Sequence, residues 1–309
     1  MIDLKGIVLR LYRYLLAALC LLSCFSTFLF FAGCAVKLGG GGSGGGGSGG
    51  GDSGGTVTVV SNTACTTTCS NSASPFGGGL GTSACPYLIC NASHLSQIGN
   101  YSSSYNYYKL SASVDLSGVA NWFAPIGTFR GSINGNSKTI SNWTYSANTT
   151  DYIALFSKFP DYSTNVISDL NISSFSVTGR DFTGSLVSMG ASTGLYAYTG
   201  SISNISVTGT TVTGRDYVGG IIGIMPGGTF SNLQFSGTVS GRSTVGGIIG
   251  GAISQMNFYS LLTTLSITNS WSSGTITGSG DGVGGLFGSL VGGLPTLTNR
   301  NVDNSSSQA

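Results

Sequence analysis

Two aspartates occupy matching positions in a repeated Gly-Arg-Asp phrase, which makes them the first candidates for chemistry in this chain. They are Asp181 and Asp216, and the third copy of the phrase has Ser243 instead. A polysaccharide hydrolase or lyase needs carboxyl groups that converge at one site, about 5–10 Å apart. Residues at equivalent repeat positions instead stack along an edge, so we interpret both as turn residues that cap local N–H groups, with a weak calcium or sugar contact as the alternative. The matching arginines are interpreted as solvated turn residues: Arg180, Arg215 and Arg242.

The other candidates for catalysis are scattered along the sequence. A polysaccharide-active enzyme would require two or more of four further aspartates in one groove, namely Asp115, Asp151, Asp161 and Asp169. His94 is the only histidine, which excludes an HExxH zinc site and any other site built on two histidines. We interpret it as a surface residue of a short helix, predicted over residues 92–98 with Asn91 or Ser93 as the N-cap. Neither a catalytic residue, a metal site nor a cofactor is therefore predicted.

A cluster of tyrosines is the strongest candidate for a binding surface. Its members lie in a polar stretch, at Tyr101, Tyr105, Tyr107 and Tyr108. Aromatic rings on a polar loop suit stacking on sugars or contact with a partner protein. Packing inside the N-terminal part of the fold is the alternative.

The first residues have the order of an export signal. Residues 1–33 begin with basic side chains and continue in an apolar run from Leu15 to Ala32. The run ends in Phe31-Ala-Gly-Cys34, which resembles the lipobox of bacterial lipoproteins, although Phe31 stands where that family has an aliphatic residue. The resemblance implies that Cys34 is lipidated and anchors the chain to the outer membrane. An uncleaved membrane anchor and an ordinary cleaved signal are the alternatives.

Residues 34–55 contain the lipidated cysteine and a segment of almost pure Gly and Ser. Such a segment is a flexible coil that reaches about 20–25 Å. It resembles an engineered linker, but a tether after a lipidation site would lift a folded domain away from the membrane surface.

Four cysteines follow the tether, at Cys65, Cys69, Cys85 and Cys90. An exported protein is in an oxidising compartment, so four cysteines predict two disulfides, with three possible pairings. A zinc site is the alternative, but the spacings are not the usual Cys-x2-Cys. We expect the disulfides to staple an N-terminal cap over residues 56–110.

The composition favours strands and tight turns over helices. Charged residues make up 7% of the chain, Gly numbers 51, and Glu is absent. Helical proteins seldom avoid good helix formers this completely, whereas Val, Ile and Thr with Gly, Ser and Asn are typical of short strands joined by turns. The net charge of +2 indicates no nucleic-acid surface.

Internal repetition points to a stacked fold. The phrase Val-x-Gly-Arg begins at Val177, Val212 and Val239, and its glycines, with Gly278 of a fourth copy, are 35, 27 and 37 residues apart. A unit this small cannot bury its apolar face alone, so neighbouring copies must stack. Columns of Thr and Asn on such a stack suggest ice binding, but the unequal spacings argue against a flat lattice.

Short glycine-flanked phrases identify the repeat more closely. They stand as Gly220-Ile-Ile-Gly, Gly247-Ile-Ile-Gly and Gly285-Leu-Phe-Gly, with a degenerate copy at Gly184-Ser-Leu-Val, and Pro86-Tyr-Leu-Ile precedes them. In this order they resemble the GLUG-repeat family of bacterial surface proteins. The resemblance implies an all-β fold, a right-handed parallel β-helix, over residues 111–309. It also implies a secreted or surface-anchored protein.

The sequence therefore predicts a non-enzymatic surface lipoprotein that presents a β-helix for adhesion or contact with the cell envelope. Its expected partners are the membrane, through the lipid, and glycans or surface proteins of another cell. A polysaccharide-active enzyme and a structural stalk are the alternatives. Adhesion is inferred from fold and compartment rather than from a site.

Overall fold

The structure is a computed structural model that describes residues 65–72, 75–101, 104–119, 124–160, 165–190, 200–253, 265–291, 296–300 and 305–308. The chain divides into two compact units, Met1–Val60 and Ser61–Ala309, and every described residue belongs to the second. The predicted signal, Cys34 and the Gly/Ser-rich tether lie outside the described residues. Within the described residues, no helix is both long and apolar enough to cross a membrane.

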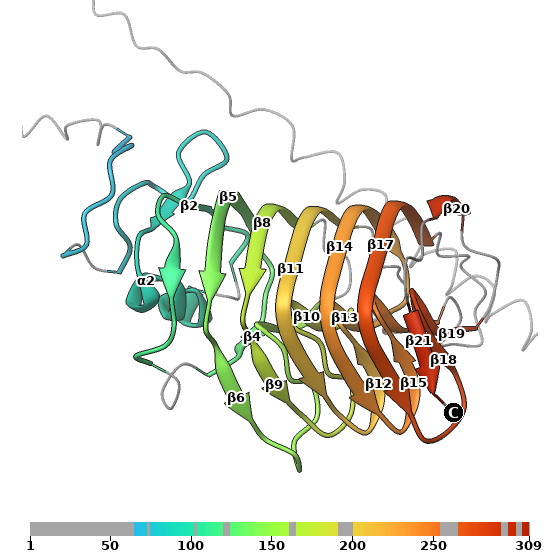
Figure 1. Ribbon diagram of the computed structural model, residues 1–309. Coiled ribbons are helices and arrows are strands. Elements are labelled where there is room, and N and C mark those ends of the chain that lie inside the picture. Colours follow the sequence, from blue (N-terminus) through green and yellow to red (C-terminus); the bar gives the residue numbers. More distant parts are fainter. Residues whose placement is uncertain are drawn as a thin grey trace, which may run out of the picture. The chain divides into compact units, whose positions relative to one another are not determined.

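The described unit is all-β and is built from parallel sheets (Figure 1). The largest sheet has a backbone of eight strands in the order β1 (Tyr87–Ile89), β2 (Tyr107–Leu110), β5 (Ser132–Ser141), β8 (Val166–Ser173), β11 (Ser201–Thr213), β14 (Gly228–Gly241), β17 (Leu265–Gly278) and β20 (Thr296–Arg300). Four shorter strands extend it: β3 (Val114–Asp115), β6 (Thr144–Ser146), β9 (Ser176–Thr178) and β21 (Ser305–Gln308).

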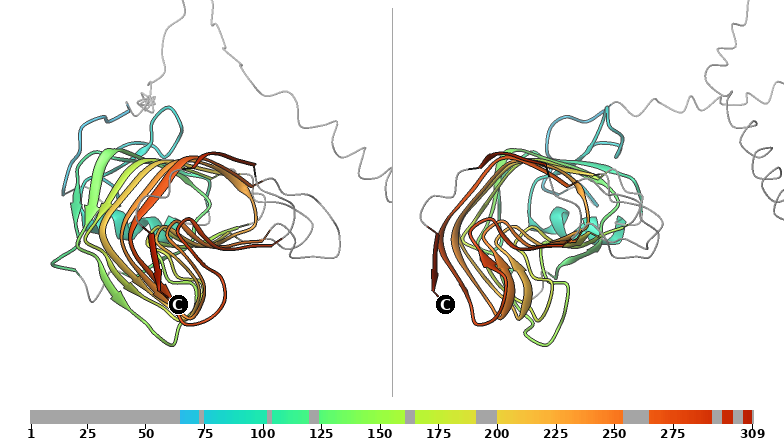
Figure 2. Two further views of the ribbon diagram at one scale, coloured as in Figure 1. Left: turned by 45° about the vertical axis from the view of Figure 1, so that its right-hand side comes forward. Right: turned by 90° about the vertical axis from the view of Figure 1, so that its right-hand side faces the viewer.

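Two further sheets complete the unit. One contains β4 (Ile126–Thr128), β7 (Phe156–Phe159), β10 (Val187–Gly190), β13 (Ile222–Met225), β16 (Ile249–Ile253) and β19 (Phe287–Val291). The other contains β12 (Asp216–Gly219), β15 (Ser243–Gly246) and β18 (Val283–Gly284). Apart from β1 and β2, the strands paired in these sheets are not consecutive in sequence, so successive repeats add strands to the sheets and lie on one another (Figure 2). This topology is compatible with the predicted β-helix.

The core is a set of apolar columns that run from repeat to repeat. Along β11, the apolar residues Ile202, Ile205, Val207 and Val212 are buried together with Thr210, and the other side chains are at least partly exposed. Register places Ile202 between Ile167 of β8 and Phe230 of β14. Each column therefore buries an apolar side chain against its counterparts above and below, which is why no repeat is stable alone.

Glycines serve both left-handed turns, as at Gly209 and Gly282 with φ of 58° and 75°, and close backbone approach between repeats. Several left-handed corners are occupied by polar residues, such as Asp169, Asn204 and Asn232, with φ of 54–57°. Asn and Asp tolerate this conformation better than most side chains. Gly220 begins one of the glycine-flanked phrases, whose glycines we call the signature glycines. It is required because a Cβ there would lie 2.2 Å from the Gly247 carbonyl oxygen of the next repeat.

The N-terminal cap contains the two predicted disulfides, and they are interleaved. Cys65 pairs with Cys85 and Cys69 with Cys90, with Cα–Cα distances of 5.7 and 5.9 Å. A Cβ on Gly77 would lie 2.0 Å from the Cys90 Sγ, so this position also needs glycine. The cap is thus covalently tied to β1, the first strand of the largest sheet.

The predicted helix is present as α2 (Ala92–Gln97), followed by a 3₁₀ turn, η1 (Ile98–Tyr101). Asn91 is the N-cap, and its side-chain oxygen accepts a hydrogen bond from the His94 N–H at 2.9 Å. The prediction that His94 lies on the surface was wrong, because it is 3% exposed. Its Nδ1 accepts a hydrogen bond from the Cys90 N–H at 3.3 Å, which fixes the ring inside the cap.

Candidate binding groove

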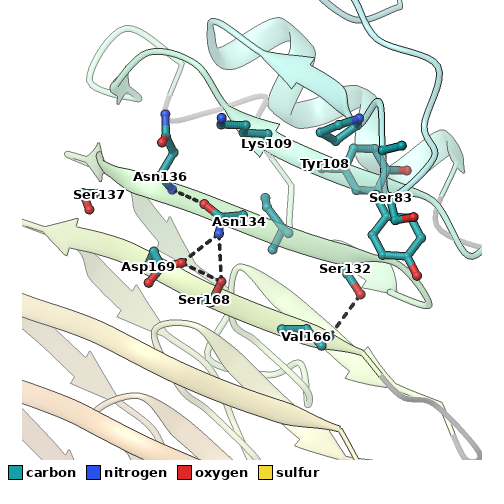
Figure 3. A pocket seen from close by; sticks show the side chains of 14 residues that line it. Ser83, Tyr108, Lys109, Ser132, Asn134, Asn136, Ser137, Val166, Ser168 and Asp169 are labelled. Atoms are coloured by element: carbon teal, nitrogen blue, oxygen red, sulfur yellow. Dashed lines mark hydrogen bonds between the residues drawn. The ribbon is translucent and has the colours of Figure 1, made fainter. Parts of the chain in front are cut away.

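An open groove of about 720 Å³ crosses the outer face of β2, β5 and β8, next to the cap (Figure 3). A smaller hollow of about 330 Å³ adjoins it and shares Lys109 and Asn136 with it. The groove is lined by hydroxyls, amides, one cation, one carboxylate and aromatic rings. Its lining includes Tyr107, Lys109, Ser132, Asn134, Ser168 and Asp169.

Strand alternation brings these side chains to one face. In β2, Tyr107 and Lys109 face outward while Tyr108 and Leu110 are buried. Parallel register then sets Ser132 beside Tyr107 and Asn134 beside Lys109. Two outward columns therefore run across three strands at about 4.8 Å per step.

The polar end of the groove is held by hydrogen bonds between strands (Figure 3). The Asn134 side-chain amide donates to Ser168 Oγ at 3.1 Å and to Asp169 Oδ2 at 2.7 Å. Asp169 also accepts from the Asn204 amide at 2.8 Å and from Ser168 Oγ at 2.9 Å. The hydrogen bond from Asn204 is the largest cause of the lowered pKa of Asp169. Burial opposes it, and the hydrogen bonds from Ser168 and Asn134 add to it. The groove therefore keeps a fixed negative charge at one end at neutral pH.

The four predicted tyrosines are divided between surface and core. Tyr105 and Tyr107 are 62% and 42% exposed, and only Tyr107 of these two lines the groove. Tyr108 is 2% exposed, which contradicts its place on a binding surface and agrees with the packing alternative; its ring contacts Phe76 and Phe129 in the core. Burial raises the pKa of Tyr108 to about 12. Tyr101 is half-buried against Phe76.

The candidate catalytic aspartates bond to separate partners. Asp115 accepts from the Asn142 amide at 2.9 Å, Asp151 binds an arginine, and Asp169 lies in the groove. Asp161 is outside the described residues. Among the residues that the structure places, no three His, Cys, Asp or Glu side chains form a cluster able to hold a metal ion.

The Gly-Arg-Asp phrases form a ladder of ion pairs. Their arginines are exposed to solvent, as predicted, but the pairing was not predicted. Each arginine binds the aspartate of the preceding repeat through two hydrogen bonds; Arg180 Nε and Nη2 lie 2.6 Å from Asp151 Oδ1 and Oδ2. Arg215 pairs in the same way with Asp181, and the next rung joins Arg242 to Asp216. Paired charges along an edge tie the repeats together and do not converge on a site.

An aromatic column accompanies this ladder. The rings of Tyr152, Phe182 and Tyr217 stack with 5.0 Å between neighbouring centroids, at interplanar angles of 6° and 11°. The Lys158 Nζ lies 4.0 Å from the Tyr152 ring centroid. The sequence contains a signal for this column that was not among the predictions above: an aromatic residue follows Asp151, Asp181 and Asp216.

Comparisons with known proteins support the fold and leave the activity open. No protein-family model matches the chain. A protein of Evansella cellulosilytica named "Putative Gly-rich membrane protein" is 37% identical over 93 residues, which cover 27% of this chain. The match spans only 11% of that relative's length. A crystal structure titled as that of a "putative immunoglobulin A1 protease" from Bacteroides ovatus is similar with a TM-score of 0.56 and 22% identity, covering 75% of this chain and 70% of the other. At that identity the similarity concerns the fold alone.

Proposed function

We propose that this chain is a surface-exposed lipoprotein whose right-handed parallel β-helix of GLUG-like repeats binds glycans through the groove on β2, β5 and β8. The lipid on Cys34 would anchor it to the outer membrane, and the Gly/Ser-rich tether would present the groove to the surroundings. The name of the Evansella relative, a membrane protein, agrees with membrane association.

The composition of the groove is the observation that supports glycan binding. Tyr107 offers an exposed ring on which the apolar face of a sugar can stack. Asn134, Ser168 and Asp169 offer amide, hydroxyl and carboxylate groups for sugar hydroxyls. The outward columns are held by sheet register, so these groups are ordered before a ligand arrives, which reduces the entropic cost of binding.

Glycan-array binding with the full-length chain tests this proposal. We expect binding to a restricted set of glycans that is lost in Tyr107→Ala and weakened in Asn134→Ala. Tyr105→Ala is the matched control, because Tyr105 is more exposed than Tyr107 but does not line the groove. Equal loss in both tyrosine variants, or binding unaffected by Tyr107→Ala, would contradict the groove as the site.

Lipid anchoring requires a separate test. In cells grown with a labelled fatty acid, the wild-type chain should incorporate the label and fractionate with the outer membrane. Cys34→Ser should lose both properties. Retention of label in Cys34→Ser would place the lipid elsewhere, and an unlabelled wild-type chain in the membrane would favour an uncleaved anchor.

A further inference from the structure

The largest sheet presents a second regular surface, well along the strands from the groove. We call it the hydroxyl array and define it by the outward residue pairs of five neighbouring strands. These are Thr144 and Ser146 in β6, Ser176 and Thr178 in β9, Thr211 and Thr213 in β11, Thr238 and Ser240 in β14, and Thr275 and Thr277 in β17. Every member carries a hydroxyl, and none is charged.

Unbroken register makes these residues a lattice. Thr211 pairs with Ser176 on one side and Thr238 on the other, and Thr238 pairs with Thr275. The register shift between β11 and β14 falls at Thr208–Thr210, before the array begins. The two hydroxyls of one strand are about 6.6 Å apart, and neighbouring strands are about 4.8 Å apart, so the array extends about 19 Å along the stack.

The unequal repeat lengths, which counted against a lattice in the sequence, do not affect the array. The difference in repeat length arises mainly in the connections that enter the long strands. These connections comprise residues 191–200 before β11, 226–227 before β14 and 254–264 before β17. From Thr211 to Thr213 and from Thr238 to Ser240, the chain advances residue for residue. The insertions therefore lie outside the array and leave its spacing regular.

The regularity of the array is not imposed by the fold. Another outward column of the same sheet contains Asn171 of β8 with Ser206, Gln234 and Trp271 in register. That column mixes amide, hydroxyl and indole side chains of very different size. The column between it and the array is again all hydroxyl, with Ser173, Thr208, Ser236 and Ser273, but the register shift at Thr208–Thr210 separates it from the array. The sheet therefore admits other outward side chains, and the run of Thr and Ser columns requires its own explanation.

The side chains beneath and within the array hold the hydroxyls in fixed positions. The intervening residues Val177, Val212, Val239 and Ile276 form a buried column with exposures of 0–1%. Threonine is β-branched and restricted at χ1, which limits the positions that its hydroxyl and methyl can take. At one end, Ser240 Oγ and Thr277 Oγ1 are 3.1 Å apart, which links neighbouring strands of the lattice.

We infer that the hydroxyl array binds the surface of ice. Water oxygens in ice repeat over distances of the same order in two perpendicular directions, and a rigid, uncharged array of hydroxyls and methyls can hold first-layer water in that pattern. Charged side chains would instead keep their own hydration shells. The arginines of the ion-pair ladder mark one edge of the array, because each stands two residues after a member of its second column.

Ice-affinity partition of the full-length chain tests this inference. When ice grows slowly in a dilute solution, the wild-type chain should concentrate in the ice fraction, and Thr211→Tyr should be excluded from it. Ser206→Tyr is the matched control, because Ser206 also faces outward on β11 but lies outside the array; it should partition like wild type. Circular dichroism melting must show that all three chains are folded.

Two outcomes would overturn the inference. One is exclusion of the folded wild-type chain from ice. Binding of that chain to microcrystalline cellulose would then assign the array to an ordered polysaccharide, and a lack of binding would assign it to neither ligand. The other is equal loss in Thr211→Tyr and Ser206→Tyr. Neither result affects the glycan-binding proposal, because the groove contains different residues.

Discussion

At the scale of the residue, the ion-pair ladder links protonation to the cohesion of the stack. Asp151 and Asp216 each receive two hydrogen bonds from the arginine of the following repeat. These bonds are the largest cause of the lowered pKa of both carboxyls, and burial opposes them. Since the pairs are partly exposed, each contributes little alone, and their effect on stability arises from repetition along the edge.

We therefore expect stability to fall on acidification. The pKa of each carboxyl is lower in the folded than in the unfolded chain, where it is about 3.9. The stabilisation is fully present above about pH 4 and is lost as the pH falls through the lower folded value. Melting temperatures of wild type and Arg242→Gln between pH 2 and pH 6 check this. The variant should melt at a lower temperature at pH 6 and show a smaller acid-induced drop; an identical pH profile would show that the ladder contributes no linkage.

At the scale of the element, close stacking of strands decides where a side chain can be tolerated. A Cβ on Gly247 would lie 2.1 Å from the Gly285 carbonyl oxygen and 2.5 Å from Ser272 Oγ. A carbonyl held in the stack cannot withdraw as a flexible side chain can. The signature glycines therefore set the distance between successive repeats.

Gly247→Ala should consequently lower the free energy of unfolding by about 1–3 kcal/mol, the range for overpacking a tight interior. Gly99→Ala in η1 is the control, since no heavy atom lies within 4 Å of a Cβ built there. That variant should be neutral or slightly stabilised. Urea unfolding of both variants provides the measurement, and equal stability of the two would show that the stack can relax around a methyl group.

The strands were predictable from sequence, whereas the corners and the groove were not. Alternation in phrases such as Leu233-Gln-Phe identifies an apolar face without knowledge of the fold. Phe182 has a left-handed backbone with φ of 58°, and its ring stacks on Tyr152 and Tyr217 of the neighbouring repeats, a contact between residues distant in sequence. The groove joins Lys109, Asn134 and Ser168, which register alone brings together. Local sequence patterns contain no signal that these three residues are neighbours in the fold.

At the scale of the whole described unit, stability is a sum over neighbouring repeats, so an end of the stack needs its own closure. The first strand, β1, pairs with β2 on one side, and the cap adjoins it through Gly77 and Gly78, which hydrogen-bond to Leu88. Phe76 and Leu95 of the cap belong to the same apolar core as the repeats. The two disulfides thus stabilise an element that protects the apolar end of the stack.

Removing one disulfide should therefore destabilise this end of the stack. Cys69 and Cys90 are 21 residues apart, and closing a loop of this length in the unfolded chain corresponds to about 3 kcal/mol. We expect Cys69→Ser/Cys90→Ser to melt well below wild type, and Cys65→Ser/Cys85→Ser, with a separation of 20 residues, to lose a similar amount.

Because repeat proteins can unfold in parts, hydrogen exchange should accompany the melting curves. Faster exchange confined to β1, β2 and the cap would locate the effect at this end. Unchanged exchange and melting would mean that packing of the cap on the core is sufficient without the covalent links.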